Sequence, residues 1–371
     1  MGGDAFGIPA ARPSPAAFAT LCAHITTSLT ESDIAIPPSL AKESHGDVDV
    51  LVSTSLTGLK GRAVGGPTVV GNLGQLEEKG DVDGVCAALC ARLGGGRWSR
   101  NGRIVSVAVP LALTSSPPPT SSSLFASNAC NASDTSTTND ASKADASDAA
   151  FHQIDLILIP SRSLLWAQMS MTYGQTRQLL KVLTRAAAGT SRLRLHDTYL
   201  GYNTPQPAFK PRREIELCVD PVQLCDWLGI GAYDPSRFHD PNPHTPSAEA
   251  TMSNKEQKER EGGMERLFAW LGSAPQGSLA RKGYAKLIQQ WKRGTLPRQV
   301  AGMGNPGSKR QQKLAREDRV VDGFCAWLAG RYGRELGEED GKDGKEAESD
   351  GELSAVRFFG KVDTYLATLE T

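Results

Sequence analysis

The sequence has no excess charge of either sign, because its 371 residues include 41 lysines and arginines and 41 aspartates and glutamates. It therefore lacks the basic excess that is the simplest argument for a nucleic-acid or membrane-surface protein, although a local basic patch is compatible with it. No run approaches the roughly 20 apolar residues that span a bilayer. The first thirty residues contain no apolar signal-peptide core. We therefore expect an intracellular protein, cytoplasmic or nuclear, with no membrane partner.

Cysteine is scarce and shows no pairing pattern. The seven cysteines are odd in number and lie at positions 22, 86, 90, 130, 218, 225 and 325. Without an export signal, this usage is typical of reduced thiols. Cys86 and Cys90 are four residues apart on a predicted helix, but no second Cys or His pair at zinc spacing accompanies them. We therefore expect both to be core residues.

The composition indicates folded parts separated by flexible ones. Hydrophobic residues make up 39% of the chain, and there are 38 glycines and 22 prolines. At about 150 residues per domain, the length suggests two domains. Three segments are too polar to offset the entropy of ordering them. These are an insertion at 112–150 rich in Ser, Thr and Ala, a linker at 236–263 and an acidic low-complexity segment at 335–352.

Apolar periodicity predicts an α+β protein. Strands are expected at 48–52, 104–111, 154–159, 193–195, 199–202 and 214–219, and helices at 13–29, 84–93, 164–188, 221–228, 264–271, 278–293, 311–332 and 355–369. We predict an α+β domain at 1–235 followed by a helical domain at 264–371. The insertion would lie between two strands that pair around it, since loop-closure entropy grows only logarithmically with length.

The most informative segment is 46–52, in which two aspartates open a β-branched apolar run. Residues two apart on a strand point to the same face, so Asp47 and Asp49 would share one side while Val48 and Val50 are buried on the other. Two adjacent carboxylates repel each other unless a cation lies between them. One or two carboxylates together with substrate phosphates form the environment that Mg²⁺ favours.

A third aspartate, Asp155, stands near the start of the strongly apolar run 154–159. If that strand lies beside the first, three carboxylates converge, as a two-metal centre for phosphoryl or nucleotidyl transfer requires. The sequence thus predicts a divalent-metal centre.

The chain contains its own comparison, because 80–83 repeats the Gly-Asp-Val-Asp tetrapeptide of 46–49. The second copy precedes a predicted helix, and Asp81 or Asp83 is expected to cap that helix. The tetrapeptide alone is therefore weak support for a metal site. The strand after the first copy and the third aspartate distinguish the two.

Ser39, seven residues, and then Asp47-Val48-Asp49-Val50 resemble the signature of the DNA polymerase β-like nucleotidyltransferase superfamily. That signature is a small-residue pair on a helix, a short gap and two acids around an apolar residue. Asp155 in its apolar strand matches the superfamily's third acid. Over about residues 1–230, the insertion excepted, the chain is similar to uncharacterised fungal nucleotidyltransferase-like proteins. The segments that carry this similarity are 2–6 near Arg12, 46–52 and 213–217.

The resemblance implies a nucleotidyltransferase-like mixed sheet with flanking helices. It also implies Mg²⁺- or Mn²⁺-dependent transfer of a nucleoside monophosphate from an NTP to a hydroxyl acceptor. The sequence does not identify this acceptor, and an RNA end, a tRNA, a small metabolite and a protein hydroxyl all remain open. Asp155 would help to orient or deprotonate that acceptor. The implied site residues are Asp47, Asp49 and Asp155 for catalysis and metal binding, and Ser39, Lys42 and Ser44 for the triphosphate.

Two alternatives remain open. Pro38 precedes Ser39 where the superfamily usually has glycine, and proline offers no N–H to a phosphate. This departure motivates the first alternative, a catalytically inactive fold that serves as a binding or scaffold protein.

The second alternative is an RNA-binding protein that acts through its C-terminal helices. Basic residues there alternate with Tyr284 and Trp291, which suits a phosphate backbone with stacked bases. The same spacing suits a solvated helix whose aromatic side chains pack inward. The basic residues are Arg281, Lys282, Lys286, Lys292, Arg293, Lys309, Arg310, Lys313 and Arg316.

Overall fold

The computed structural model describes residues 5–7, 10–29, 34–39, 45–53, 82–115, 151–204, 214–238, 252–297, 308–336 and 355–361. Backbone contacts divide the chain into two units, and each unit has its own hydrophobic core. The first unit comprises 1–37, 41–164 and 240–260, and the second comprises 38–40, 165–239 and 261–371. The protein is α+β, as the sequence predicts.

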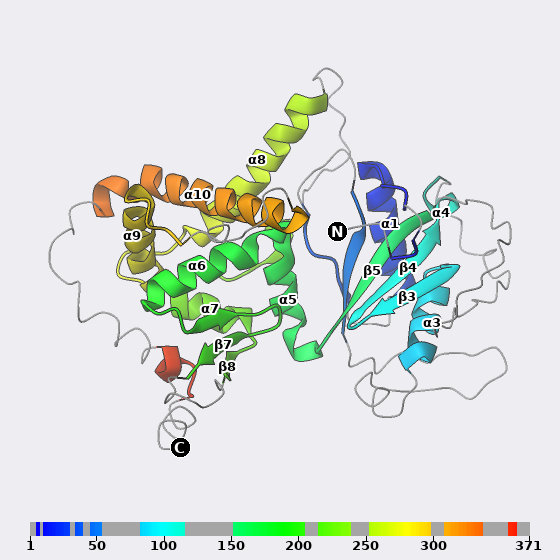
Figure 1. The fold of residues 1–371 in the computed structure, drawn as a ribbon, viewed down its shortest axis with the longest axis horizontal. Helices are drawn as coiled ribbons and strands as arrows, with labels where there is room; N and C mark the ends of the chain where they lie inside the picture. The colour runs from blue at the N-terminus through cyan, green and yellow to red at the C-terminus, as the bar shows by residue number, and fades with distance from the viewer. Residues whose placement is uncertain are drawn as a thin grey trace. The chain divides into compact units, whose positions relative to one another are not determined.

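The first unit is built on a five-stranded mixed sheet with strand order β1-β2-β5-β4-β3 (Figure 1). β2 and β5 are parallel, and the other neighbouring strands are antiparallel. β4 and β5 pair around the segment that separates them, as expected for an insertion between two strands. The strands are β1 (Ile34–Ala35), β2 (Val48–Ser53), β3 (Arg97–Asn101), β4 (Ile104–Pro110) and β5 (Phe151–Ile159).

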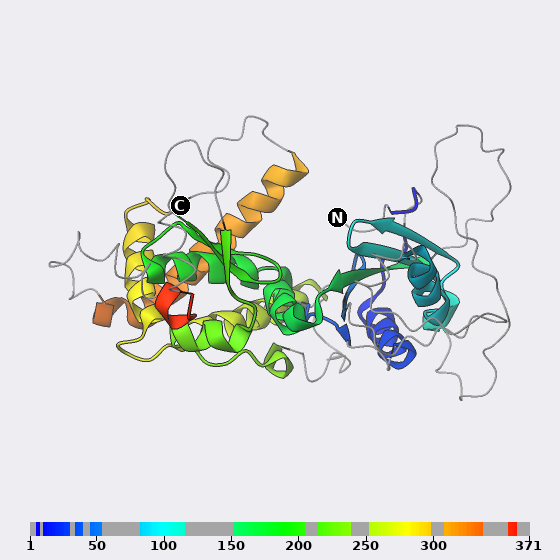
Figure 2. The same cartoon turned by 90° about the horizontal axis from the view of Figure 1, so that it is seen from below.

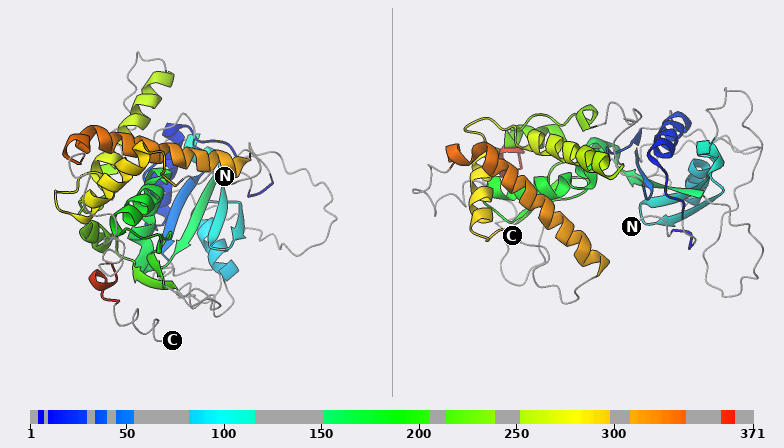
Figure 3. Two further views of the ribbon diagram at one scale, coloured as in Figure 1. Left: turned by 60° about the vertical axis from the view of Figure 1, so that its left-hand side comes forward. Right: turned by 90° about the horizontal axis from the view of Figure 1, so that it is seen from above.

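Helices α1 (Pro15–Ser28) and α3 (Val82–Arg92) lie on the same side of this sheet (Figures 2 and 3). α1 begins with a proline, and the Ser14 hydroxyl accepts a hydrogen bond from the Ala17 N–H at 3.3 Å. Alternate residues of the three central strands pack against the two helices. These are Val48, Val50, Val52, Val105, Val107, Val109, Ile154, Leu156 and Leu158. The other face of the sheet therefore carries the residues between them, including Asp49 and Asp155.

The second unit combines helices with a three-stranded antiparallel sheet of order β6-β7-β8. α6 packs against α9 and α10, and α9 also packs against α10 (Figure 3). α8 contributes to this unit from residue 261 onward. The elements are α5 (Leu164–Met171), α6 (Thr176–Ala188), β6 (Leu193–Leu195), β7 (Leu200–Asn203), β8 (Glu214–Cys218), α7 (Pro221–Leu228), α8 (Met252–Leu271), α9 (Leu279–Lys292) and α10 (Lys309–Leu336). The described residues also form three 3₁₀ turns, η1 (Ser161–Ser163), η2 (Thr172–Gly174) and η3 (Pro235–Phe238), the short helix α4 (Ala112–Ser115) and a helical turn at 355–358. Of these, η1 and α4 belong to the first unit.

A glycine brings α6 and α9 close together. A Cβ atom at Gly283 would lie 3.0 Å from the backbone nitrogen of Ala187, which is tighter than ordinary van der Waals contact. The two helices therefore approach at a point where only the smallest residue fits without displacement.

Several predicted segments differ from the structure. The linker predicted at 236–263 contains most of η3 and the first turns of α8, since the Lys, Glu, Gln and Arg residues at 255–261 are good helix formers. The disordered insertion predicted at 112–150 begins with α4, and 116–150 lies outside the described residues. The acidic segment predicted at 335–352 begins inside α10, and 337–352 lies outside the described residues. Of the helix predicted at 355–369, 355–358 is helical and 362–369 is not described.

Two further predictions concern the burial of a pair of cysteines and the presence of membrane-spanning helices. Cys86 and Cys90 are buried in the first core, as expected, and burial raises the pKa of the Cys86 thiol to about 11. Among the helices that the structure describes, none combines the length and the apolar character needed to cross a lipid bilayer.

Candidate metal centre

Three aspartates of the first unit lie together near the start of β2. One carboxylate oxygen from each of Asp47, Asp49 and Asp155 lies within 4.8 Å of the corresponding oxygens of the other two. The strand register explains this proximity, because Asp49 and Asp155 are direct neighbours in the parallel pair β2–β5 and Asp47 immediately precedes β2. The structure thus brings together the three carboxylates that the sequence singled out.

The cluster is open on one side and anchored on the other. Asp49 is exposed and Asp47 and Asp155 are half-buried, whereas Val48 and Val50 are fully buried on the opposite face of β2. The apolar residues hold the strand in the sheet through their contacts with α1 and α3. Asp49, which alternates with them, is the exposed member of the cluster and is accessible from water.

Asp155 is held by two neutral donors. The Ser106 hydroxyl donates a hydrogen bond to Oδ1 of Asp155 at 2.7 Å, and Nε2 of Gln153 donates to the same oxygen at 2.8 Å. Ser106 is the residue opposite Asp155 on β4, and Gln153 precedes it by two positions on β5. The two bonds orient the carboxylate without occupying its other oxygen, Oδ2.

The donor set fits a hard divalent cation. All three side chains of the cluster are carboxylates, and oxygen ligands of this kind suit Mg²⁺ and Mn²⁺. Structural zinc sites instead rely on cysteine and histidine, and the cluster contains neither. Mutual repulsion of carboxylates so close together is relieved when a cation binds between them. The three aspartates thus form a cluster that could hold a divalent cation of this kind.

Ser106 and Gln153 are not among the site residues predicted from the sequence, although each is a polar residue in a mostly apolar strand. Ser106 is the one hydroxyl residue in the apolar strand Ile104–Pro110. Gln153 is two residues before Asp155, so strand alternation places both on one face. Both are almost completely buried, at 7% and 3% exposure. A buried polar residue in an apolar strand calls for a hydrogen-bond partner, and here the partner is Asp155.

The residues expected to bind the triphosphate are described only in part. Ser39 is exposed and belongs to the second unit, through the segment Pro38–Leu40. The Pro38 carbonyl accepts a hydrogen bond from the Tyr173 N–H at 2.8 Å within that unit. Lys42 and Ser44 lie outside the described residues. Their contact with a triphosphate stays a prediction.

The second copy of the tetrapeptide behaves as a helix start. Asp83 is exposed in the first turn of α3, where its charge faces the positive end of the helix dipole. Asp81 lies outside the described residues. Val48 and Asp49 of the first copy open a strand, whereas Val82 and Asp83 of the second open a helix, so the surroundings of these residues decide their role.

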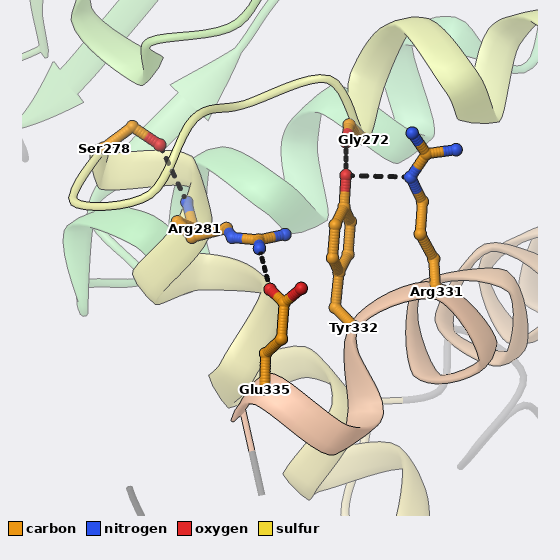
Figure 4. Close-up of polar contacts among 6 residues, drawn as sticks. All are labelled: Gly272, Ser278, Arg281, Arg331, Tyr332 and Glu335. Atoms are coloured by element: carbon orange, nitrogen blue, oxygen red, sulfur yellow. Dashed lines mark hydrogen bonds and ion pairs between the residues drawn. The ribbon is translucent and has the colours of Figure 1, made fainter. Parts of the chain in front are cut away.

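Among the described residues of the C-terminal helices, the two aromatic side chains of the basic face pack to different extents against the second core. Tyr284 is fully buried and Trp291 packs partly against the second core. Arg281 turns inward, over the ring of Tyr332, and forms an ion pair with Glu335 (Figure 4). The side chains of Lys309 and Arg310 are not described. Burial of Tyr284 and partial packing of Trp291 favour the interpretation as a solvated helix, and RNA binding by this face stays a prediction.

No protein-family model matches the chain, and no curated protein is similar to it at a significant level.

Proposed function

We propose that the protein is a Mg²⁺- or Mn²⁺-dependent nucleotidyltransferase whose first unit has a nucleotidyltransferase-like fold. It transfers a nucleoside monophosphate from an NTP to a hydroxyl acceptor. The observation that carries this proposal is the convergence of Asp47, Asp49 and Asp155 within 4.8 Å, where the start of β2 lies beside the middle of the parallel strand β5. The resemblance of 39–52 to the superfamily signature supports it independently of the geometry.

The chain's own residues have distinct roles in this proposal. Asp47 and Asp49 hold the divalent cations, which when bound neutralise phosphate charge and acidify the attacking hydroxyl. Asp155, oriented by Ser106 and Gln153, aligns that hydroxyl and accepts its proton. A bond forms between the acceptor oxygen and the α-phosphorus, and the bond from that phosphorus to the leaving pyrophosphate breaks.

The test incubates the full chain with each labelled NTP, Mg²⁺ or Mn²⁺ and a mixed RNA pool. Label transfer and pyrophosphate release are measured. We expect Asp49→Asn to lower the rate at least about 100-fold, since even partners outside the first ligand shell contribute 10- to 100-fold. The matched control is Asp83→Asn, the same change in the second copy of the tetrapeptide, where the side chain is exposed at a helix start. We expect this control to retain the wild-type rate.

Two results would contradict the proposal. If Asp49→Asn is as active as the wild type, the carboxylate cluster does not take part in the reaction. No transfer with any nucleotide, together with no Mg²⁺-dependent heat when ATP or CTP is titrated into the protein, would instead favour the catalytically inactive scaffold. Circular dichroism of both variants establishes that a lost activity is not a lost fold.

A further inference from the structure

Gln153 carries an amide oxygen without a hydrogen-bond partner in the described part of the chain. The residue is only 3% exposed, and its Nε2 donates to Asp155 at 2.8 Å. The amide oxygen Oε1 is bonded to the same carbon as Nε2, so it lies next to the carboxylate cluster. This is a buried acceptor placed beside the site of the proposed chemistry.

The orientation of this amide is fixed by chemistry. If the amide were reversed, Oε1 would face Oδ1 of Asp155, and two acceptors would oppose each other. Nε2 must therefore point to Asp155, and Oε1 must point elsewhere. The Ser106 hydroxyl donates its one hydrogen to Oδ1 of Asp155, so it has none left to donate to Gln153.

No donor of the described residues pairs with this buried acceptor, and a bound ligand can supply one. Polar atoms in protein interiors are nearly always hydrogen-bonded, and an unpaired one forfeits the bonds it makes to water in the unfolded chain. A cation is a poor candidate, because the three nearby carboxylates are stronger ligands for it than a neutral amide. A hydroxyl group on the substrate is the natural donor.

We propose that Asp155 and Gln153 together recognise a vicinal diol on the acceptor, an inference that rests on the proposed function. The reacting hydroxyl donates to Asp155, and the neighbouring hydroxyl donates to Oε1 of Gln153. Two adjacent acceptors on one strand face match two adjacent donors on one sugar. Gln153 is then a specificity-determining residue. The diol comes either from the terminal ribose of an oligonucleotide or from a free ribonucleoside.

The experiment measures binding without turnover. The full chain is titrated, in Mg²⁺ and without NTP, against a fluorescent oligoribonucleotide and against the same oligonucleotide ending in 2′-deoxyribose. We expect the ribose end to bind about tenfold more tightly, the contribution of one hydrogen bond. Competition by a free ribonucleoside, compared with its 2′-deoxy form, distinguishes the second source of the diol.

Two variants separate recognition from simple support of Asp155. Gln153→Met keeps the length of the side chain and removes both polar atoms. Ser106→Ala removes the other hydrogen bond to Oδ1 but keeps Oε1 of Gln153. We expect Gln153→Met to reduce the ribose-to-deoxyribose ratio to about one, and Ser106→Ala to keep the ratio while weakening both ligands alike. Gln153→Leu serves as a second variant with the same expectation.

The outcomes distinguish this inference from the proposed function. The inference is overturned if the wild type binds the ribose and deoxyribose ends equally well. It is also overturned if Gln153→Met and Gln153→Leu keep the preference for ribose, or if the protein binds no diol. Label transfer that depends on Asp49 but ignores the 2′-hydroxyl leaves the transferase and removes the role of Gln153. A Gln153-dependent ratio without any label transfer leaves diol recognition and removes the transferase.

Discussion

The guanidinium of Arg281 lies 3.6 Å from the centre of the Tyr332 ring, and its side chain is only 11% exposed. The Tyr332 hydroxyl donates to the carbonyl of Gly272, next to the end of α8, and accepts a hydrogen bond from Nε of Arg331 at 3.1 Å (Figure 4). Arg281 therefore rests on a ring that connects α10 to α8. Its ion pair with Glu335, which is 64% exposed, contributes little by comparison.

This packing predicts that Arg281 stabilises the fold. We expect Arg281→Ala to lower the free energy of unfolding by about 1–2 kcal/mol, through loss of the cation–π contact and of the packed alkyl stem. Its neighbour Lys282 is exposed, and Lys282→Ala should change that free energy by less than about 0.5 kcal/mol. Urea unfolding of both variants measures the difference. Unchanged stability with weakened single-stranded RNA binding in Arg281→Ala would instead assign this arginine to a nucleic-acid surface.

At the same scale, the sequence predicts the three aspartates of the candidate site but not the residues that donate hydrogen bonds to Asp155. Asp47, Asp49 and Asp155 stand out because apolar residues flank them locally. Ser106 reaches Asp155 only through the register of β4 on β5, with a long segment between the two strands. Strand alternation determines which face a residue occupies, but it does not determine which residue of another strand lies opposite.

At the scale of elements, α6 presents a row of cations. Arg177, Lys181 and Arg185 recur every four residues, so they share one face of the helix, and Arg194 on β6 lies close to them. Burial lowers the pKa of Lys181 from its usual 10.5, and these three arginines lower it further. Glu317 on α10 opposes the effect but does not cancel it.

We therefore expect Lys181→Gln to stabilise the protein near neutral pH by a few tenths of a kcal/mol, the usual scale of like-charge pairs on a helix. The native pKa lies below the unfolded one, so between the two values the unfolded chain binds the proton that the native protein has released. Wild-type stability then rises with pH, and the advantage of Lys181→Gln should shrink as pH approaches 10.5. Chemical unfolding of both proteins across this range measures the difference.

The control for this prediction is Lys292→Gln, an exposed lysine in the last turn of α9. That position favours a positive charge, so its loss should leave stability unchanged or slightly lower. An advantage of Lys181→Gln that persists above the titration of the lysine would contradict the electrostatic explanation.

Prediction of elements from sequence succeeds where periodicity is strong. The β-branched runs of β2 and β5 and the apolar spacing of α9 indicate these elements clearly. β3 is missed because its sequence, Arg-Trp-Ser-Arg-Asn, has one apolar side chain and lies mostly outside the core. β1 has only two residues, too few for any pattern. Their strand form depends on pairing with β4 and β2, which local sequence does not encode.

At the scale of the whole molecule, the predicted division at about residue 235 differs from the grouping of contacts. The core of the second unit joins Leu180 and Leu224, from before that point, to Trp270 and Leu287 after it. The helices expected to form a separate domain thus share their core with α5 to α7 and the sheet β6–β8. Periodicity assigns each helix a buried face, but it does not identify which partner covers that face.

Separate cores predict separate unfolding. Trp98 lies in the first unit and the other tryptophans, at 166, 227, 270, 291 and 327, lie in the second, so tryptophan fluorescence reports mainly on the second. Leu89 is fully buried in the first core and Leu287 is 2% exposed in the second. Replacing either with alanine should cost about 2–5 kcal/mol in its own unit.

We therefore expect Leu89→Ala to shift the unfolding of the first unit, followed by circular dichroism, to lower denaturant concentration. The midpoint of the fluorescence transition, which reports mainly on the second unit, should stay in place. Leu287→Ala should shift the fluorescence midpoint to lower denaturant concentration and leave the unfolding of the first unit unchanged. Each core is buried by its own unit, and a leucine can destabilise only the structure that excludes it from water. If Leu89→Ala moves both probes together, the two units unfold as one, and the stability of the carboxylate site depends on the helices that follow it.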